Sequence, residues 1–181
     1  KGGVHFLIDH EIAIHQFKHE LVESIGQSSK SLAEQVALVQ KHQASLPCTL
    51  LHGDAHVGNT YKTKDGERGY LDFQLSARGF CMHDVSYTIV TSLSVHDRRQ
   101  SELNLINVYR ERLIEQGVRA PPSLDMLFEE YRRAMAWNLY IGWLTSPTEN
   151  YGWEITVGNL VRIATAYRDL DSANAIADLS K

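Results

Sequence analysis

Three side chains near the middle of the sequence carry oxygen atoms of the kind that phosphoryl-transfer sites use. Asp54 and Asn59 lie in the segment His-Gly-Asp-Ala-His-Val-Gly-Asn, and Asp72 lies further on in Tyr-Leu-Asp-Phe-Gln. A carboxylate and an amide oxygen can both bind magnesium, and a further carboxylate can accept a proton from an attacking hydroxyl group. Together the three residues indicate a metal-assisted phosphoryl transfer, in which positioning and charge neutralisation supply most of the catalysis.

A predicted β-hairpin would bring two of these residues together. The runs 60–63 and 68–73 have strand character and are joined by Lys-Asp-Gly-Glu. Asp-Gly between two such runs favours a two-residue type I′ turn. With Asp and Gly as the two turn residues, Asn59 falls directly opposite Asp72. Opposed side chains on one face have Cβ atoms about 4.5–5.5 Å apart, close enough to share one cation.

The two segments resemble known catalytic and metal-binding loops. His-Gly-Asp-x-His-x-Gly-Asn followed by Leu-Asp-Phe-Gln resembles the motifs of the aminoglycoside phosphotransferase and choline kinase-like superfamily. The Asp-Phe-Gln form is most similar to its ecdysteroid-kinase-like branch and to the bacterial phosphotransferase enzyme family. The resemblance continues through Arg78-Gly79, the segment 83–87 and the helical tail, and so covers most of the chain after Cys48.

The resemblance implies a reaction and a role for each residue of the triad. A γ-phosphate of ATP, or of GTP, would be transferred to a hydroxyl group of a small-molecule acceptor. Asp54 would be the catalytic base or would orient the hydroxyl. Asn59 and Asp72 would hold Mg²⁺ and, through it, the nucleotide phosphates. An aminoglycoside, a choline-like amino alcohol, a steroid and a sugar all remain open as acceptors.

The resemblance also assigns neighbouring positions. His56 would contact the transferring phosphate, although an imidazole is only partly charged at neutral pH. His52 and Asp84 would support the catalytic loop from behind. Gly53 stands where protein kinases carry an arginine that reads a phosphorylated activation loop, and Gln74 replaces the glycine of Asp-Phe-Gly. These departures favour a small-molecule acceptor over a protein.

The expected fold class is α+β and mainly helical, the large C-terminal lobe of a kinase-like protein. A helical lead-in (1–47) would precede the catalytic loop and metal hairpin (48–80) and a helical, substrate-side subdomain (81–181). A capping box starting at Ser31 and possible N-caps at Asp84 and Ser94 mark helix starts. Apolar residues at helical spacing predict helices over about 9–25, 31–43, 84–94, 94–116, 123–145 and 151–170, with a short strand at 49–51 and a frayed end at 171–181.

Composition restricts the partners. The net charge of −4 and the lack of a basic cluster argue against nucleic acid and anionic membranes. No apolar run approaches the ~18 residues of a membrane span, so a soluble, cytoplasmic protein is expected. Cys48 and Cys81 are then free thiols.

The start of the sequence suggests a missing lobe. The chain begins with Lys1 rather than methionine, and the residues before His52 are predicted to be helical rather than to form a sheet. Gly2-Gly3 is the only glycine pair near the start, without a third glycine to form a phosphate-covering loop. We therefore expect a small N-terminal lobe in the full-length protein, and no activity from this chain alone.

Two further groups of residues have a functional and a simpler interpretation. His15 and His19 have the spacing of a metal-binding pair on a helix, but without a third ligand they are expected to be solvent-facing. An acceptor pocket could be lined by Trp137, Trp143 and Trp153, but packing between helices is the simpler interpretation.

Two other functions are compatible with parts of the pattern. A kinase-like module that binds a ligand without catalysis would keep the same motifs. Gly-Asp-Ala-His-Val-Gly-Asn also resembles the opening motif of two-metal phosphoesterases. The later motifs that complete two metals are missing from the sequence, which makes this the weaker alternative.

Overall fold

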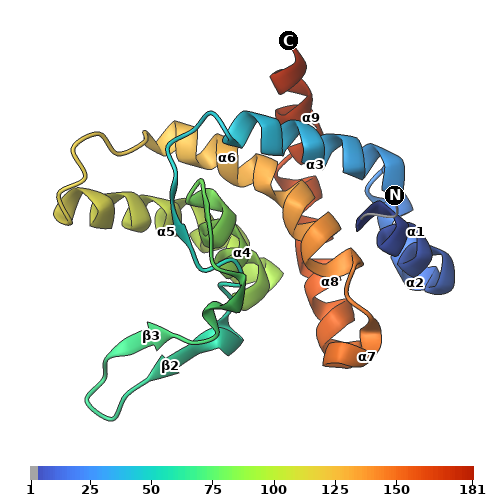
Figure 1. Ribbon diagram of the computed structural model, residues 1–181, viewed down its shortest axis with the longest axis horizontal. Coiled ribbons are helices and arrows are strands. Elements are labelled where there is room, and N and C mark those ends of the chain that lie inside the picture. The colour runs from blue at the N-terminus through green and yellow to red at the C-terminus, as the bar shows by residue number, and fades with distance from the viewer. Residues whose placement is uncertain (1–3) are drawn as a thin grey trace. The chain divides into compact units, whose positions relative to one another are not determined.

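The computed structural model describes residues 4–181, and most of them are helical, as the apolar spacing predicts (Figure 1). The helices are α1 (Val4–Ile14), α2 (Gln16–Ser24), α3 (Ser29–Gln43), α4 (Met82–Ser92), α5 (Val95–Glu115), α6 (Leu124–Trp137), a π-helical continuation of α6 (Asn138–Leu144), α7 (Thr148–Tyr151), α8 (Trp153–Asp169) and α9 (Ser172–Ala177). Single 3₁₀ turns lie at Val57–Asn59, Phe73–Leu75 and Asp178–Ser180. None of the helices in this described part is both long and apolar enough to cross a membrane.

The contacts divide the chain into two compact units. The terminal unit contains the residues up to His42 and those from Arg132 onward, and the central unit contains residues 43–131. The terminal unit buries an apolar core from α1, α3, α6 and α8 that includes Ile8, Leu32, Met135, Leu160 and Ile163. The central unit carries every residue of the predicted catalytic site.

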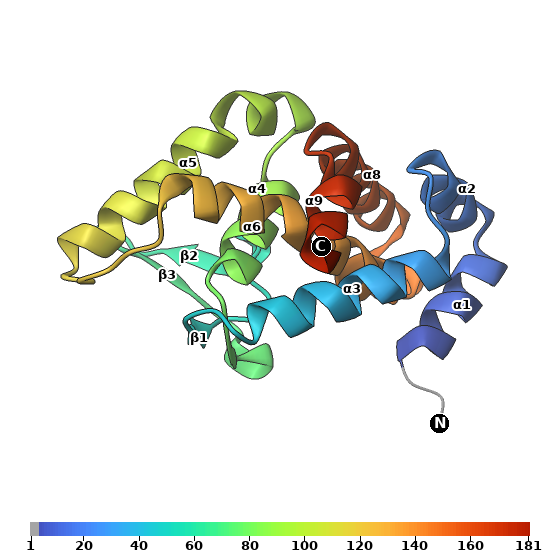
Figure 2. The same ribbon diagram turned by 90° about the horizontal axis from the view of Figure 1, so that it is seen from above.

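Two small antiparallel sheets belong to the central unit. β1 (Thr49–Leu51) pairs with β4 (Ala77–Gly79), and β2 (Thr60–Lys62) pairs with β3 (Arg68–Tyr70). Both views show the β2–β3 hairpin extending away from α4 (Figures 1 and 2). The β1–β4 pair therefore closes a loop that contains both the catalytic segment and the hairpin.

The hairpin forms where the sequence predicts it, but the predicted register is wrong by one residue. Thr60 pairs with Tyr70, which places Asn59 opposite Leu71 rather than opposite Asp72. The turn has three residues, because the Thr63 amide donates to the Glu67 carbonyl at 2.8 Å and so pairs these two residues, while the Thr63 carbonyl accepts from the amide of Gly66 at 3.0 Å. A type I′ turn needs positive φ at both central residues, whereas here Gly66 alone is left-handed, at φ +89°.

Two helix boundaries also differ from the prediction. The helix expected over 9–25 is broken at His15, whose φ and ψ of −117° and 97° are extended. The helix expected from Ser31 starts earlier, because Ser28 is its cap: the Ser28 hydroxyl accepts from the Ser31 amide at 3.1 Å, and the Ser31 hydroxyl accepts from the Ser28 amide at 2.9 Å. Ser94 caps α5 as predicted, accepting from the Asp97 amide at 3.1 Å.

The break at His15 accompanies a buried ion pair in the terminal unit. Lys18 is completely buried, and its Nζ lies 2.6 Å from Glu11 Oε2. The same ammonium group donates to the carbonyls of Leu144, at 3.2 Å, and Ser146, at 2.8 Å. All three of its protons therefore have acceptors, and two of these lie at the end of the π-helix.

The expectation of a frayed C-terminus is wrong. Ala175 and Ile176 of α9 are each only 1% exposed. Arg132 donates through Nε to the carbonyl of Leu170 at 2.6 Å, and Arg133 donates to that of Ala175 at 3.0 Å. Burial and these bonds tie the last helix to α6.

Candidate functional site

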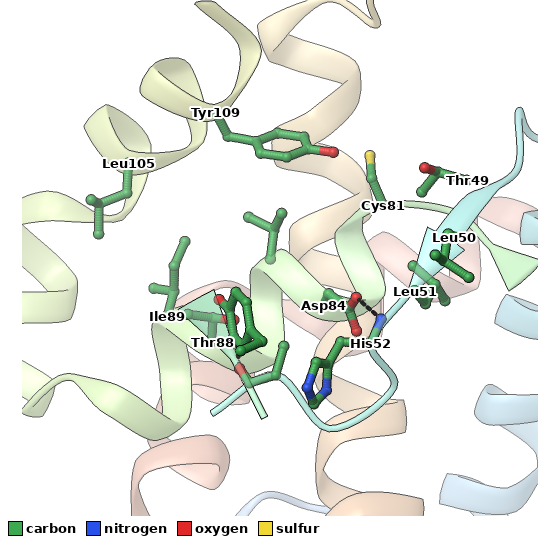
Figure 3. A pocket seen from close by; sticks show the side chains of 13 residues that line it. Thr49, Leu50, Leu51, His52, Cys81, Asp84, Thr88, Ile89, Leu105 and Tyr109 are labelled. Carbon is green, nitrogen blue, oxygen red and sulfur yellow. Dashed lines mark hydrogen bonds between the residues drawn. The ribbon is translucent and has the colours of Figure 1, made fainter. Parts of the chain in front are cut away.

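The start of the catalytic loop is held by one carboxylate. Asp84 Oδ2 accepts from the amide of His52 at 2.6 Å, and Oδ1 accepts from the amide of Gly53 at 3.0 Å (Figure 3). Asp84 lies in the first turn of α4 rather than at its N-cap, so the predicted capping role is wrong, and the carboxylate serves another segment. Burial lowers the pKa of the neighbouring His83, so this imidazole is neutral at neutral pH and places no charge beside the carboxylate.

Gly53 is required by the shape of this loop. Its φ of +85° lies in the region that favours glycine. A Cβ at this position would lie 2.1 Å from the carbonyl oxygen of Leu75, which is backbone and has little room to move. The arginine that protein kinases carry here would therefore not fit.

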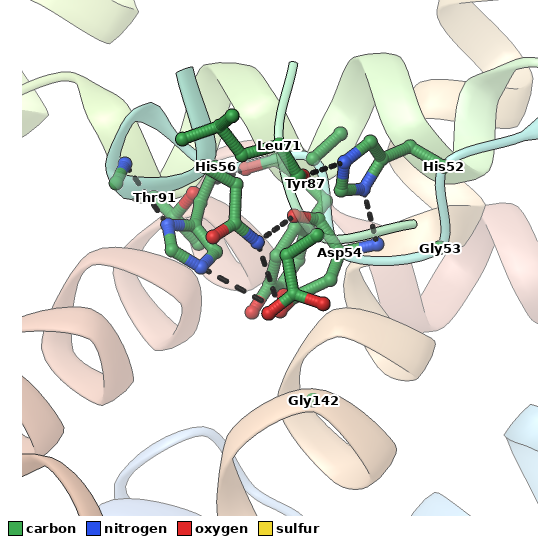
Figure 4. Close-up of polar contacts among 12 residues, drawn as sticks. His52, Gly53, Asp54, His56, Leu71, Tyr87, Thr91 and Gly142 are labelled. Carbon is green, nitrogen blue, oxygen red and sulfur yellow. Dashed lines mark hydrogen bonds and ion pairs between the residues drawn. The ribbon is translucent and has the colours of Figure 1, made fainter. Parts of the chain in front are cut away.

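The His52 ring connects the catalytic loop to the metal hairpin (Figure 4). Its Nδ1 accepts from the amide of Asp54 at 3.2 Å, which leaves the proton on Nε2 to be donated to the carbonyl of Leu71 at 2.7 Å. The ring packs between Tyr70 and Phe73, at centroid distances of 5.0 and 4.7 Å. One neutral imidazole thus fixes the backbone of Asp54 relative to the residue that precedes Asp72.

Asp54 and Asn59 are in direct contact. The Asn59 side-chain amide donates to the Asp54 carbonyl at 3.0 Å and to the Asp54 carboxylate oxygen Oδ2 at 3.2 Å. His56 Nδ1 accepts from the amide of Gly58 at 3.0 Å, so its Nε2 carries the proton. That nitrogen faces the same Asp54 oxygen at 3.6 Å. Both neighbours therefore face the same carboxylate oxygen, Oδ2.

Asp72 adopts a conformation that is uncommon for residues other than glycine. Its φ and ψ are 59° and 65°, in the left-handed region, just before the 3₁₀ turn Phe73–Leu75. Such a conformation costs about 1–3 kcal/mol. Aspartate adopts it more readily than most residues, and Asp171 does so as well. The exposed carboxylate of Asp72 accepts from the Gln74 side chain at 3.4 Å. The bend follows directly after the hydrogen bond of 2.7 Å between the Leu71 amide and the Asn59 carbonyl.

The side-chain chemistry of Asn59 and Asp72 fits magnesium. The Asn59 amide nitrogen is directed to Asp54, which leaves the carbonyl oxygen Oδ1 as a ligand. Within the described residues, no three His, Cys, Asp or Glu side chains are grouped closely enough to hold a metal ion. Magnesium is usually held by only one or two carboxylates together with water and substrate phosphates, so this small set is of the right kind.

A second support of the catalytic loop was not predicted from the sequence. Thr88 Oγ1 donates to the carbonyl of Ala55 at 2.5 Å, and the amide of Val57 donates to Ser92 Oγ at 3.2 Å. Asp84, Thr88 and Ser92 are spaced at i, i+4 and i+8, so one face of α4 carries three polar contacts to the loop. This polar stripe on an otherwise apolar helix is the signal that could have revealed it.

The other candidate residues belong to the terminal unit. His19 is solvent-facing as expected and lies 3.6 Å from Glu23 within α2. His15 is not, because its side chain is only 19% exposed and lies 3.5 Å from Glu11, across the break between α1 and α2. Trp143 is buried and packs against Tyr151 at 5.4 Å, whereas Trp153 is exposed and meets Phe17 edge-on at 4.6 Å. Trp137 is partly buried.

The comparison with family models defines the class of this protein. It is a member of the protein-kinase-like superfamily that contains the aminoglycoside phosphotransferases and choline kinases. The model of the ecdysteroid kinase-like family matches residues 8–119, more than half of the chain, and the chain belongs to this family. Searches of curated proteins and of solved structures gave no match.

Proposed function

We propose that this protein is a small-molecule kinase that transfers the γ-phosphate of ATP, or of GTP, to a hydroxyl group. The observation that carries the proposal is the contact of 3.2 Å between the Asp54 carboxylate and the Asn59 amide in a chain of the ecdysteroid kinase-like family. In this superfamily's phosphoryl transfer, one carboxylate acts on the attacking hydroxyl and an adjacent asparagine assists the metal.

Asp54 is placed to orient the hydroxyl and accept its proton. Its side chain is 24% exposed, so one end reaches solvent while the backbone is fixed by His52 and Asn59. Because the Asn59 amide and the His56 imidazole both face Oδ2, the free Oδ1 is the atom that we assign to the acceptor hydroxyl. The neutral His56 also has a proton on Nε2 that can be donated to a phosphate oxygen.

Asn59 and Asp72 are the proposed magnesium ligands. When bound, magnesium would neutralise charge on the phosphate oxygens of the nucleotide. The chain contributes an amide oxygen that Asp54 holds in one orientation and a carboxylate whose position is set by the left-handed bend. His52 couples the two, since its ring bonds to the backbone of both segments.

The test is the substitution Asp54→Asn in the full-length protein. We expect acceptor-dependent release of ADP, measured with Mg-ATP over a panel of hydroxyl-bearing small molecules, to fall by about a hundredfold or more in kcat. The matched control is Asp65→Asn at the exposed hairpin tip, which makes the same chemical change and should leave kcat unchanged.

Two outcomes would contradict this proposal. A loss in kcat of less than about tenfold, equivalent to about 1.4 kcal/mol of barrier, would exclude Asp54 as the base. Complete absence of magnesium-dependent nucleotide turnover in the wild-type protein would favour a binding module without catalysis.

A further inference from the structure

A cavity of about 470 Å³ lies in the central unit, behind the catalytic loop (Figure 3). Its walls come from β1, from the start of the catalytic loop, and from α4 and α5. Asp54, Asn59 and Asp72 do not line it, so it is separate from the groups that we assign to phosphoryl transfer. Its volume falls within the range of about 300–1,000 Å³ that is typical of small-molecule sites.

The lining offers an apolar surface. Leu50, Leu51, Val85, Ile89 and Leu105 contribute aliphatic side chains, and two tyrosine rings complete the wall. Among the thirteen residues that line the cavity there is no lysine or arginine. A phosphate or carboxylate ligand would therefore find no positive charge to offset the loss of its hydration.

Three polar residues of the lining already hold the catalytic loop. Both oxygens of Asp84 accept from backbone amides, and both ring nitrogens of His52 have backbone partners. Thr88 Oγ1 donates to the carbonyl of Ala55. The oxygens of Asp84 are therefore bonded to the loop backbone, and most of the surface that a ligand meets is carbon.

Tyr109 and Cys81 add no charge at neutral pH. Burial raises the pKa of the Cys81 thiol and that of the Tyr109 hydroxyl above their ordinary values. Figure 3 shows the hydroxyl of Tyr109 directed toward the sulfur of Cys81. The two groups thus form a neutral polar spot at one end of an apolar wall.

We propose that this cavity is a binding site for an uncharged, mostly apolar, ring-containing molecule, and that its occupancy stabilises the catalytic loop. The coupling follows from shared residues, because His52 and Asp84 form part of the wall and also hold the loop backbone. A ligand that packs against them opposes the local unfolding that would break the hydrogen bonds from the amides of His52 and Gly53 to Asp84. This inference does not depend on the identity of the reaction.

A pair of related dyes provides the first test. N-phenyl-1-naphthylamine is uncharged, and 1-anilinonaphthalene-8-sulfonate carries a sulfonate on the same anilinonaphthalene scaffold. Each dye is titrated into the full-length protein, and its fluorescence is excited at a wavelength longer than tryptophan absorbs. The neutral dye should bind saturably with one-to-one stoichiometry. It should bind at least about tenfold more tightly than the sulfonate, since the cavity offers no cation.

Two matched variants locate the binding. Leu105 lines the cavity and is 36% exposed, so Leu105→Trp should narrow the mouth without disturbing the core. Leu103 lies on the same helix, is 52% exposed and does not line the cavity. We expect Leu105→Trp to weaken the neutral dye by about tenfold or more and Leu103→Trp to leave its affinity unchanged. Equal effects of the two variants, equal affinity for both dyes, or no saturable binding would overturn the site.

Hydrogen exchange tests the coupling without any variant and without an activity assay. Saturating neutral dye should slow exchange of the amides of His52 and Gly53 and leave the amides of the exposed turn at 64–67 unaffected, since Tyr70 is the one residue of the β2–β3 hairpin that lines the cavity. Unchanged exchange at these two amides, with dye bound, would overturn the link to the catalytic loop. A failure of the kinase assay would leave both readouts intact, so the two proposals can fail separately.

Discussion

The carboxylate of Asp84 determines where the catalytic loop begins, because two consecutive backbone amides point at its two oxygens. A carboxylate can satisfy both donors at once, and hydrogen bonds to a charged acceptor contribute more to stability than neutral ones. The strand β1 therefore ends in a bend whose donors are satisfied by α4, and the bend orients Asp54 away from the strand.

Replacing Asp84 by asparagine should release this bend. One oxygen becomes an NH₂ group, which leaves a backbone amide facing another donor, at a cost of about 1–3 kcal/mol. We expect a lower free energy of unfolding and faster hydrogen exchange at His52 and Gly53. Asp65→Asn is the matched control, because that side chain is exposed on the hairpin turn. Equal exchange rates in the two variants would contradict the role of Asp84.

Lys18 is the most deeply buried charged side chain among the described residues of the terminal unit. Lys18→Met keeps the chain length but leaves the Glu11 carboxylate and two carbonyl groups without their donor. Breaking one side of a buried ion pair costs about 3–5 kcal/mol, and we expect that loss in urea unfolding of the variant. Lys30→Met is the control, since this side chain is 87% exposed and should change stability by less than about 0.5 kcal/mol. A loss below about 1 kcal/mol in Lys18→Met would show that the pair contributes little.

The candidate site could be recognised from the sequence, but the directions of its side chains could not. The segment around Asp54 identified the candidate site, because carboxylate, amide and imidazole groups at this spacing have few structural uses. The contact between Asn59 and Asp54 depends on the 3₁₀ turn Val57–Asn59, which no local pattern predicted. Lys18 gave no signal, since a lysine on a polar helix face is normally solvent-exposed.

At the scale of the elements, α4 is the scaffold of the site. Its apolar residues Ile89 and Val90 are buried, while the stripe of Asp84, Thr88 and Ser92 holds the loop. The helix was predictable from its apolar spacing, and the stripe explains why these polar residues occur in it. The hairpin was predictable from Asp-Gly between two runs of strand character, but Asp-Gly suits a two-residue and a three-residue turn alike. The choice is made by Thr63, whose hydroxyl accepts from the Glu67 amide at 3.0 Å.

Two glycine substitutions should have opposite effects on stability. Gly66→Ala places a side chain at φ +89° with nothing within 4 Å, so conformational strain alone should destabilise the hairpin by about 1–2 kcal/mol. Gly158→Ala in α8 also meets nothing within 4 Å but lies in a helix, where alanine is favoured by about 0.5–1 kcal/mol. Thermal unfolding of the two variants measures both. A stabilised Gly66→Ala would show that the turn is not left-handed.

At the scale of the whole molecule, the described residues carry a candidate catalytic carboxylate and candidate metal ligands but few groups that could hold a nucleotide. Within residues 4–181 the sheets are two pairs of three-residue strands, and no larger sheet is present to cover an adenine ring. The Gly2-Gly3 pair lies outside the described residues. The family match begins at residue 8 and therefore includes the helices that precede the catalytic loop.

The 181-residue chain by itself should therefore bind Mg-ATP weakly. In this superfamily the nucleotide lies between two lobes, under a loop and against a lysine of the smaller lobe. Losing that ion pair and several hydrogen bonds should lower the affinity by about a hundredfold or more relative to the full-length protein. Calorimetric titration of both proteins with Mg-ATP measures the difference. The same titration of Asp72→Asn in the full-length protein shows how much of the affinity depends on this proposed magnesium ligand. Micromolar binding by the 181 residues alone would mean that they contain a complete nucleotide site, and that the phosphates are held by groups other than those of a second lobe.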